Sequence, residues 1–468
     1  MSSTVLPLFV ALIAVISVLM SPRAKNDQAF FQGYSPNGLP PTLLTLTFSQ
    51  VTTWIFARSL MNAAILGYFY GIWGTLAYAA YYISFLTGGW IVDSLRFKHG
   101  FESVQDFLRV KFGSVGTRCY NFVIGIRLIS EVFSNLLVIG ILFGAAGSDP
   151  YVVAILAFSL VTLLYSALGG LHASLRTDLF QMVIFLVMLV VLMAIMLGHP
   201  SFSVSALMFK EFDLTDPGPV LLVVALLQVI SYPMHDPVMM DRGFIADRQT
   251  TRRSFFHAFW ISFVCIMLFG ALGVFAGSQA MPGETMNDTL PRLMGDVPMV
   301  VFNAALIISA MSTLDSTLSS SAKLVAKDMR VVEPTLPNGR IVMVLFMLAG
   351  LMFVFFGSKD LFDAVAVSGT AAMYLLPVIV FSLWMSWDYV PKWSYVFSFA
   401  LALLGAALYF TESSGYSNVI EPWLGISHKY SKLLVISVHV AVLGCLSFWL
   451  GRAFELRKLG QAAASNHG

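Results

Sequence analysis

The sequence contains one polar stretch, inside otherwise apolar surroundings, whose residue types and spacing could bind a cation. The stretch SAMSTLDSTLSSS, residues 309–321, has eight hydroxyl side chains and one carboxylate, that of Asp315. On a helix, five of the hydroxyl positions share one face, and these are Ser309, Ser312, Thr313, Ser316 and Ser320. Such a stripe suits a hard cation such as Na⁺, although further oxygens must come from a second segment.

The same stripe also has a purely structural interpretation. Small hydroxyl residues let membrane helices pack closely against one another. The carboxylate favours a functional role, because an aspartate at the centre of a membrane helix costs about 2.5–3.5 kcal/mol on the insertion scale and is usually paired or functional.

The composition is that of an integral membrane protein. Of 468 residues, 58% are hydrophobic and only 11% are charged, whereas soluble domains are about 25% charged. The three cysteines, Cys119, Cys265 and Cys445, have no CxxC spacing, which argues against a disulfide framework and a zinc site. Nucleotide-binding fingerprints and HExxH are absent from the sequence, and no nucleophile–base set is visible. We therefore expect a protein that is not an enzyme and has no nucleic-acid partner.

Apolar segments long enough to cross a bilayer, about 17–25 residues each, recur along the whole chain. They predict an all-α membrane protein with about 13 transmembrane helices, at 5–20, 42–69, 72–93, 118–146, 151–169, 174–197, 218–243, 254–277, 297–327, 340–356, 361–387, 393–410 and 431–452. We expect the first to be a retained helix rather than a signal peptide. With the N-terminus outside and the C-terminus cytoplasmic, 20 of the 27 Lys and Arg residues, including those of 242–253, lie inside, as the positive-inside rule predicts.

Residues 100–114, GFESVQDFLRVKFGS, predict a short amphipathic helix on the cytoplasmic surface. Its apolar face, directed at lipid or protein, would consist of Val104, Phe107, Leu108 and Phe112. The simpler interpretation is a loop helix that covers the bundle.

Two of the predicted spans contain signals of an interrupted helix. In the second, the polar run SQVTT (49–53) lies in apolar sequence, and in the seventh Pro233 and Pro237 flank His235 and Asp236. Proline removes a backbone donor, so the helix must kink or open there. Freed carbonyls are tolerated in a membrane only where they line a cavity or are otherwise satisfied. A structural proline kink is the alternative.

The positions of the two interrupted spans, second and seventh, predict an inverted repeat. Five helices followed by five more divide the chain naturally, and because five is odd the second set enters the membrane from the opposite side. The first helix of each repeat would be discontinuous. The expected divisions are an extra N-terminal helix (1–24), the first repeat (25–200), the inverted second repeat (201–388), and two extra helices with a short cytoplasmic tail (389–468).

Two motifs resemble the sodium/solute symporter family, which includes sodium-coupled carriers for sugars, proline, pantothenate and sialic acid. The stretch YSALGGLHASLRTDLFQ (165–181) resembles the family signature at Gly169, Gly170, Leu171, Ala173, Thr177, Asp178 and Gln181. The stretch SAMSTLDSTLSSSAKLVAKDM (309–329) resembles the cation-binding helix, and the segment from Pro237 to Arg242 resembles the broken seventh span. Span count and spacing agree from about residue 25 to 410.

This resemblance implies a leucine-transporter-like core with a sodium site between the first and eighth core helices. The implied ligands are the hydroxyls of Ser312 and Thr313 and the carbonyls of Ser309, Phe48 and Val51. Phe48 departs from the small residue usual at its position. Some relatives bind a second sodium near the cytoplasmic end, and Asp178 and Ser316 fall at its ligand positions. Asp315 stands where hydroxyls are more common, so the two carboxylates would form a second cation site or a proton site.

The helix interruptions also define a candidate solute site. The expected solute contacts are Gln50, Trp54, Arg58, Tyr232 and Asp236, with Tyr374 as a gate candidate. Arg58 would attract a carboxylate or pair with Asp236 or Glu131. Arg127 and Glu131, four residues apart, would neutralise each other. An acid and a base near one cavity favour a zwitterionic or carboxylate-bearing solute over a plain sugar, while the aromatic residues have packing as their alternative role.

Together these features predict a sodium-coupled secondary active symporter that imports a small organic solute, such as an amino acid or organic acid, by alternating access. It would use one or two Na⁺ ions and lie in the cell inner (plasma) membrane as a multi-pass protein. The solute and the lipid bilayer would be its partners, and no obligate protein partner is indicated. The alternatives are a proton-coupled carrier that titrates at Asp178 or Asp315, and a non-transporting solute sensor on the same fold.

Overall fold

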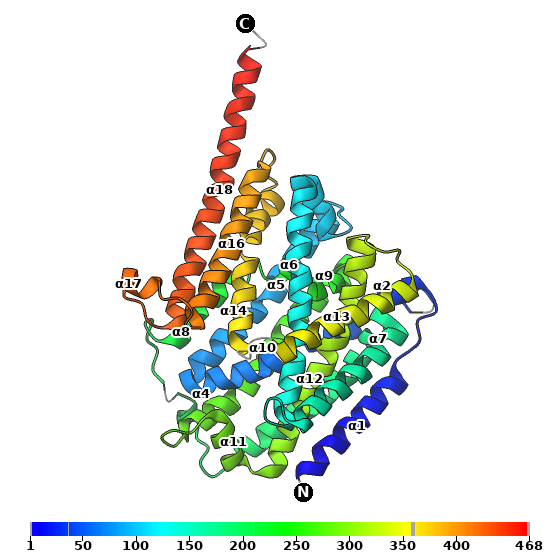
Figure 1. The fold of residues 1–468 in the computed structure, drawn as a ribbon, viewed down its shortest axis with the longest axis vertical. Coiled ribbons are helices and arrows are strands. Elements are labelled where there is room, and N and C mark those ends of the chain that lie inside the picture. Colours follow the sequence, from blue (N-terminus) through cyan, green and yellow to red (C-terminus); the bar gives the residue numbers. More distant parts are fainter. Residues whose placement is uncertain (1, 36, 209, 357–360, 466–468) are drawn as a thin grey trace.

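The computed structural model describes the whole chain except residues 1, 36, 209, 357–360 and 466–468. The described residues form helices and connecting loops without a strand, and eight of the helices are long and apolar enough to cross a membrane. Figure 1 shows an elongated bundle with its two termini at opposite ends. The predicted all-α membrane fold is confirmed, whereas the count of 13 spans is not.

The first part of the chain supplies the helices that surround the first interruption. They are α1 (Ser2–Met20), α2 (Asp27–Gln32), α3 (Leu43–Trp54), α4 (Ala57–Ala80), α5 (Ser84–Val92), α6 (Val104–Phe143) and α7 (Asp149–Leu197). A 3₁₀ turn, η1 (Tyr81–Ile83), precedes α5, and a π-helical turn, η2 (Asp93–Lys98), follows it.

The second part begins with the other interrupted helix. Its elements are η3 (Val204–Met208), α8 (Pro217–Gln228), η4 (Pro233–His235), α9 (Pro237–Gly243), α10 (Arg248–Ser278), α11 (Met286–Met294), α12 (Asp296–Lys323), η5 (Leu324–Asp328), α13 (Leu336–Phe356) and α14 (Leu361–Ala372). The chain closes with α15 (Leu375–Pro377), η6 (Val378–Trp384), α16 (Lys392–Ser413), α17 (Ile420–Leu424) and α18 (Lys429–Ser465), which projects from the bundle in Figure 1.

Glycine turns subdivide three of the long helices. Gly71, Gly113 and Gly170 have φ values of 63°, 66° and 56° inside α4, α6 and α7. Only glycine adopts this backbone region readily, so each of these residues turns the chain sharply between two helical pieces. The turn at Gly71 separates the predicted spans 42–69 and 72–93. The turn at Gly113 separates the amphipathic helix from the next span, and the four apolar residues predicted for its face are buried against protein.

The contact between α4 and α10 depends on small residues. A Cβ added to Gly273 would lie 1.9 Å from the Ala64 carbonyl oxygen, and one added to Gly277 would lie 2.2 Å from that of Tyr68. Glycines therefore let the two backbones approach closely, which is how helices associate in a bilayer. This contact fixes the part of α4 that follows the first interruption.

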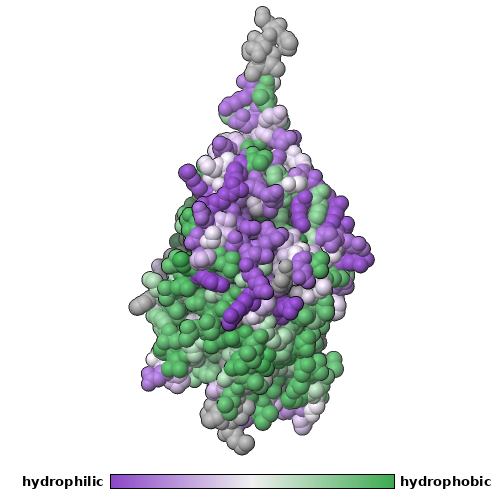
Figure 2. Space-filling model, turned by 90° about the vertical axis from the view of Figure 1, so that its right-hand side faces the viewer, coloured by the Kyte–Doolittle hydropathy of each residue, from purple (hydrophilic) through white to green (hydrophobic). Residues whose placement is uncertain are grey.

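The outer surface has the two zones expected of a membrane protein. Figure 2 shows a broad apolar surface over the lower part of the molecule, with hydrophilic residues gathered above it, toward the projecting end of α18. Large apolar side chains are exposed along the second half of α7, as at Val183, Val187 and Val190. In water such a surface would aggregate, whereas in a bilayer it faces lipid.

Candidate cation and solute sites

Helix α3 continues through the stretch in which we expected the first interruption. It is helical over Leu43–Trp54, and the chain leaves helical geometry only at Ile55 and Phe56. The interruption predicted within 49–53 therefore lies about one turn too early in the sequence. The polar run keeps its helix because its hydroxyls bond back to carbonyls one turn earlier, as Thr52 Oγ1 does to the Phe48 carbonyl oxygen at 2.9 Å.

The carbonyls freed at this first interruption are bound by side chains from two other helices. The Trp54 carbonyl accepts a hydrogen bond of 2.7 Å from the Tyr82 hydroxyl. The Ile55 carbonyl accepts one from Ser309 Oγ of α12. Buried carbonyls need such partners, so the break is satisfied and α3 is joined to α12 at this point.

The second interruption lies where the prolines predicted it. Helix α8 ends at Gln228, a single tight turn covers Pro233–His235, and α9 starts at Pro237. Asp236 has extended φ and ψ of −106° and 102°, and its carboxylate accepts the Met239 backbone N–H at 3.0 Å. Aspartate before proline is a helix start signal, so Asp236 caps α9 as well as facing the interior.

The residues of the predicted first cation site come from α3 and α12, which contact one another. Ser312 and Thr313 are buried, and Ser312 Oγ donates to Asp178 Oδ1. Thr313 Oγ1 donates to the Ser309 carbonyl at 3.0 Å. The Phe48 carbonyl, which lies inside α3, accepts the Thr52 hydroxyl at 2.9 Å in addition to its helical bond, and the Val51 carbonyl accepts the Ile55 N–H at 2.9 Å. Of these two oxygens, that of Val51 keeps a further lone pair for an ion.

A small cavity lies beside these residues, and of the five predicted ligand residues Ser309 and Ser312 line it. Its volume is about 10 Å³ and it is lined from α3, α7 and α12, by Thr52, Ile55, Gln181, Met182, Phe185, Ile308, Ser309 and Ser312. A space of this size holds one water-sized particle. The Oε1 atom of Gln181 is buried and has no hydrogen-bond partner among the described residues. The cavity therefore combines the size of a single small ion with oxygens at its wall.

The residues of the predicted second cation site form one hydrogen-bonded cluster beside it. Ser174 Oγ donates to Asp315 Oδ1 at 2.7 Å and lies 3.4 Å from Asp178 Oδ2. Thr177 Oγ1 donates to Asp315 Oδ2 at 2.9 Å, and Ser316 Oγ lies 2.8 Å from Ser174 Oγ. Asp178, Asp315 and Ser316 are all fully buried. The structure thus brings both carboxylates of the prediction into one site between α7 and α12.

Arg242 enters this cluster from α9. Its Nη2 donates to Ser316 Oγ at 2.8 Å and lies 3.6 Å from Asp178 Oδ2, and its Nε donates to Ser49 Oγ at 2.9 Å. The sequence-based charge count assigned Arg242 to the cytoplasmic side, and its side chain is fully buried in the bundle. Only the tertiary structure supplies the carboxylate that compensates a guanidinium in this position.

The charged candidates of the solute site form a buried chain of ion pairs. Arg58 Nη2 lies 2.9 Å from Glu131 Oε1, Glu131 also binds Arg127, and Arg127 Nη2 lies 2.9 Å from Asp236 Oδ2. Each of these side chains is at most 3% exposed. The chain joins α4, α6 and the start of α9. Arg58 therefore pairs with Glu131, one of the alternatives left open by the sequence, and Arg127 and Glu131 do contact each other.

Around this chain of ion pairs lie aromatic rings and buried polar atoms that have no hydrogen-bond partner among the described residues. Among the described residues, no partner is found for Nε and Nη1 of Arg58, both amide atoms of Gln50, or Nε1 of Trp54. The rings of Trp54 and Tyr232 meet edge to face with centroids 5.6 Å apart, and the Arg127 guanidinium lies 5.4 Å from the Tyr232 ring. Buried donors and acceptors of this kind are unusual in a packed core and are typical of a site that binds a polar ligand. Tyr374 lies elsewhere, against Tyr395 and Phe399.

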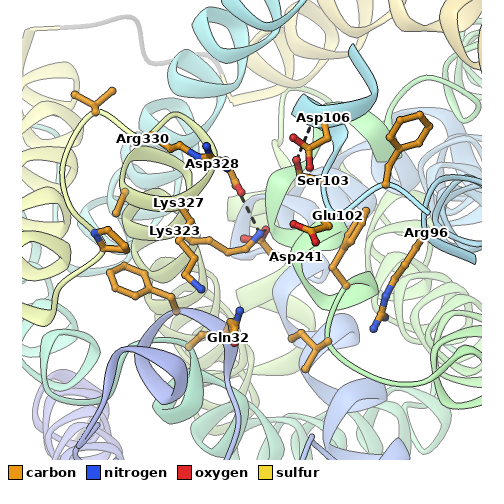
Figure 3. Close-up of a pocket in the computed structure, with 18 of the residues that line it drawn as sticks. Gln32, Arg96, Glu102, Ser103, Asp106, Asp241, Lys323, Lys327, Asp328 and Arg330 are labelled. Atoms are coloured by element: carbon orange, nitrogen blue, oxygen red, sulfur yellow. Dashed lines mark hydrogen bonds and ion pairs between the residues drawn. The ribbon is translucent and has the colours of Figure 1, made fainter. Parts of the chain in front are cut away.

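A larger cavity of about 950 Å³, which we call the vestibule, lies on the far side of α9 (Figure 3). Its charged lining includes Arg96, Glu102, Asp106, Asp241, Lys323, Lys327, Asp328 and Arg330. Lys323 binds Asp241 and lies 3.6 Å from Asp328. Asp241 and Arg242 are neighbours on α9, so this short helix separates the vestibule from the Asp178 cluster.

Sequence reasoning missed several residues of these sites. Ser49, Ser174, Thr177 and Arg242 contribute hydrogen bonds to the Asp178 cluster, and Tyr82 binds the first interruption. Thr177 lies inside the recognised signature, so its motif could have indicated it. Ser174 lies in the same quoted stretch, Ser49 in the polar run 49–53 and Arg242 at the end of the segment from Pro237 to Arg242, but their partners could not be read from the sequence. Tyr82 has no sequence signal, because an isolated tyrosine in an apolar span looks the same whether it packs or binds.

Comparison with known proteins finds similarity to one family and to several solved structures. A model of the sodium:solute symporter family matches residues 41–242. Sodium/glucose cotransporter 4 of Danio rerio is 29% identical over 162 residues, which are 31% of this chain and 24% of that protein. The chain therefore matches about a quarter of the length of this relative. The residues matched by the family model include the motif at 165–181 and confirm the resemblance there, whereas the motif at 309–329 lies outside them.

Solved structures share the fold across nearly the whole chain. A substrate-bound, outward-open Na⁺-coupled sialic acid symporter gives a TM-score of 0.71 with 17% identity, covering 96% of this chain and 98% of that one. Mhp1, a nucleobase-cation-symport-1 family transporter, in a closed conformation with bromovinylhydantoin, gives 0.56 with 16% identity over 93% and 96%. These are structures of transporters. They confirm the leucine-transporter-like fold.

Proposed function

We propose that the protein is a sodium-coupled symporter that imports a small carboxylate-bearing or zwitterionic solute through the plasma membrane. Its N-terminus would lie outside and its C-terminus in the cytoplasm, with the two five-helix units 25–200 and 201–388 as inverted repeats. The match to a sodium:solute symporter model and the shared fold support the coupling class. The observation that carries the proposal is the ion-sized cavity between the interrupted α3 and the hydroxyl face of α12.

The first sodium site would use the carbonyls of Phe48, Val51 and Ser309 with the hydroxyls of Ser312 and Thr313. All five oxygens are neutral, which suits a monovalent hard cation better than a transition metal. In agreement, no group of three or more His, Cys, Asp and Glu side chains suited to a metal ion occurs in the described part of the chain. Asp178, Asp315 and Ser316 would hold a second cation beside it.

The solute would bind at the two interruptions, beside the ion-pair chain. The residues that surround this region are Gln50, Trp54, Arg58, Tyr232 and Asp236. Several of their buried polar atoms have no hydrogen-bond partner among the described residues. A carboxylate of the solute would find free N–H groups on Arg58, because guanidinium groups bind carboxylates with two parallel hydrogen bonds. An amino group on the same solute would be directed toward Asp236 or Glu131. A plain sugar would leave the arginine donors unmatched.

Alternating access would follow from a bridge between α3 and α12. Sodium from outside would stabilise the contact between these helices, solute would bind beside the interruptions, and the bundle would rock to expose the vestibule. In the cytoplasm, where sodium is scarce, the bridge would weaken and both cargoes would leave through the vestibule. One charge moving down 100 mV supplies about 2.3 kcal/mol, which is enough to drive accumulation.

A purified-protein experiment tests both coupling and cargo. Thermal unfolding is followed in NaCl or KCl while amino acids, carboxylates and sugars are screened. We expect sodium to raise the melting temperature, and a carboxylate-bearing solute to raise it further only with sodium. The double variant Ser312→Ala, Thr313→Ala should lose the part of the sodium effect that comes from the first site. Ser319→Ala is the matched control, because Ser319 is buried on the same helix and its Oγ has no partner among the described residues.

A proton-coupled carrier is the second candidate, because Ser174 Oγ lies within 3.4 Å of carboxylate oxygens of both Asp178 and Asp315. The Ser174 hydroxyl can donate its proton to only one of the two carboxylates at a time. The other carboxylate then lacks this donor, so the pair has room for a further proton that the two carboxylates would share. Solute binding that is indifferent to sodium but changes with pH, and that disappears in Asp315→Asn, would replace the sodium proposal with this one.

A further inference from the structure

Arg242 contacts the same oxygens that a second cation would need as ligands. Its guanidinium donates to Ser316 Oγ at 2.8 Å and lies 3.6 Å from Asp178 Oδ2. It is also anchored to its own helix, with Nη1 donating to the Val238 carbonyl at 3.1 Å. Asp178 and Ser316 are the ligands assigned above to the second site, so a cation and Arg242 would contact the same atoms.

The shared oxygens exclude joint occupation, and the charges make full vacancy costly. The fully buried cluster holds two carboxylates, those of Asp178 and Asp315, and one guanidinium. A cation bound to Asp178 Oδ2 and Ser316 Oγ would take the place of the guanidinium Nη2, because both positive groups need the same two atoms and repel at contact distance. If neither were present, two buried carboxylates would be uncompensated, which proteins avoid. Exchanging one positive charge for the other leaves the net charge of the cluster unchanged.

We propose that Arg242 is a tethered counter-cation that competes with the second transported cation for Asp178 and Ser316. The proposal rests on the proposed function above and adds a role for a residue on α9. When the cation leaves toward the cytoplasm, the guanidinium takes its place, so the unloaded carrier can return without an uncompensated pair of carboxylates. When a cation binds from outside, it displaces the guanidinium.

The other side of α9 provides a place for the displaced guanidinium. Asp241, the preceding residue, and Asp328 line the vestibule and share a single ammonium group, that of Lys323. Figure 3 shows these three side chains grouped together at the vestibule wall. A guanidinium moved from the Asp178 cluster to this group would again meet carboxylate. Cation binding in the membrane is thereby linked to the contacts that line the vestibule.

The test uses purified full-length protein and sodium as the probe. Thermal unfolding is titrated with NaCl at constant ionic strength, balanced with choline chloride. All titrations carry Thr313→Ala to silence the first site, since the Thr313 hydroxyl donates to the Ser309 carbonyl and not to the Asp178 cluster. Arg242→Gln should lower the half-saturating sodium concentration about tenfold or more, because it removes a charged competitor. Arg242→Lys keeps the charge and should stay within about threefold of the parent.

Two outcomes would overturn the proposal. If Arg242→Gln leaves half-saturation unchanged, there is no competition, and if it raises half-saturation or abolishes the sodium effect, Arg242 assists binding instead. Should Arg242→Gln fail to fold, Arg242→Gln, Asp315→Asn is compared with Asp315→Asn alone, since the double variant restores the charge of the cluster, and the same decrease is expected. Failure of the proposed function differs: the protein with Thr313 intact would then show no sodium effect at all.

Discussion

Glu131 is the residue on which the buried ion-pair chain depends most. Its Oε1 accepts from Arg58 at 2.9 Å and also from Arg127, and its side chain is 3% exposed. Glu131→Gln keeps the shape of the side chain but removes the charge that both arginines face. Asp236 then remains as the carboxylate in contact with Arg127, at 2.9 Å, and Arg58 loses its ion-pair partner.

We expect this substitution to lower the free energy of unfolding by about 3–5 kcal/mol, the usual effect of removing one partner of a buried pair. The measurement is unfolding by SDS titration in detergent micelles. Asp106→Asn is the control, because the Asp106–Arg109 pair spans 3.7 Å with side chains 34% and 50% exposed. An exposed pair of this kind contributes about 0–1 kcal/mol.

The same variant also tests whether Arg58 can receive a carboxylate. Once Glu131 is neutral, acetate should recover part of the lost stability when compared with chloride at the same ionic strength, because a small carboxylate restores the missing charge. A stability of Glu131→Gln within about 1 kcal/mol of the parent would refute the reasoning. Such a result would mean that the arginines are hydrated or compensated elsewhere.

Two further predictions concern the outer loop and the helix contact. The Arg292 guanidinium binds Glu284 outside the spans and lowers the pKa of this carboxyl from 4.5 to about 2. The stabilisation that this ion pair gives the folded state should therefore be complete above pH 4.5 and be lost as the pH falls toward 2. Thermal unfolding between pH 7 and pH 3 should show this pH-dependent loss in the parent but not in Glu284→Gln. Gly273→Ala should destabilise the protein by about 1–3 kcal/mol, because the added methyl group would overpack against Ala64. Gly125→Ala is the control, since open space surrounds this position, and it should leave stability unchanged. Equal melting temperatures of the two variants would contradict the packing argument.

Much of the fold could be predicted from local sequence because a bilayer imposes a simple rule. Apolar length identifies membrane helices, and proline identifies the second interruption, since Pro233 and Pro237 cannot keep a regular helix. The first interruption was misplaced because the run 49–53 contains neither proline nor glycine. Two of its side chains, Thr52 and Thr53, bond back to carbonyls of their own helix. The chain opens at Ile55 and Phe56, where Tyr82 and Ser309 bind the carbonyls of Trp54 and Ile55.

The sequence by itself determined the class of the protein, the hydroxyl stripe from Ser309 to Ser320 and the presence of buried charge. Composition, motif and helical period are local properties that can be read along one chain. Only the tertiary structure decided how those charges are compensated: that Arg58 faces Glu131, and that Arg242 crosses from α9 to Asp178. The partners in these pairs are separated by 73 and 64 positions, and a contact between distant segments depends on how helices pack, which no local pattern encodes.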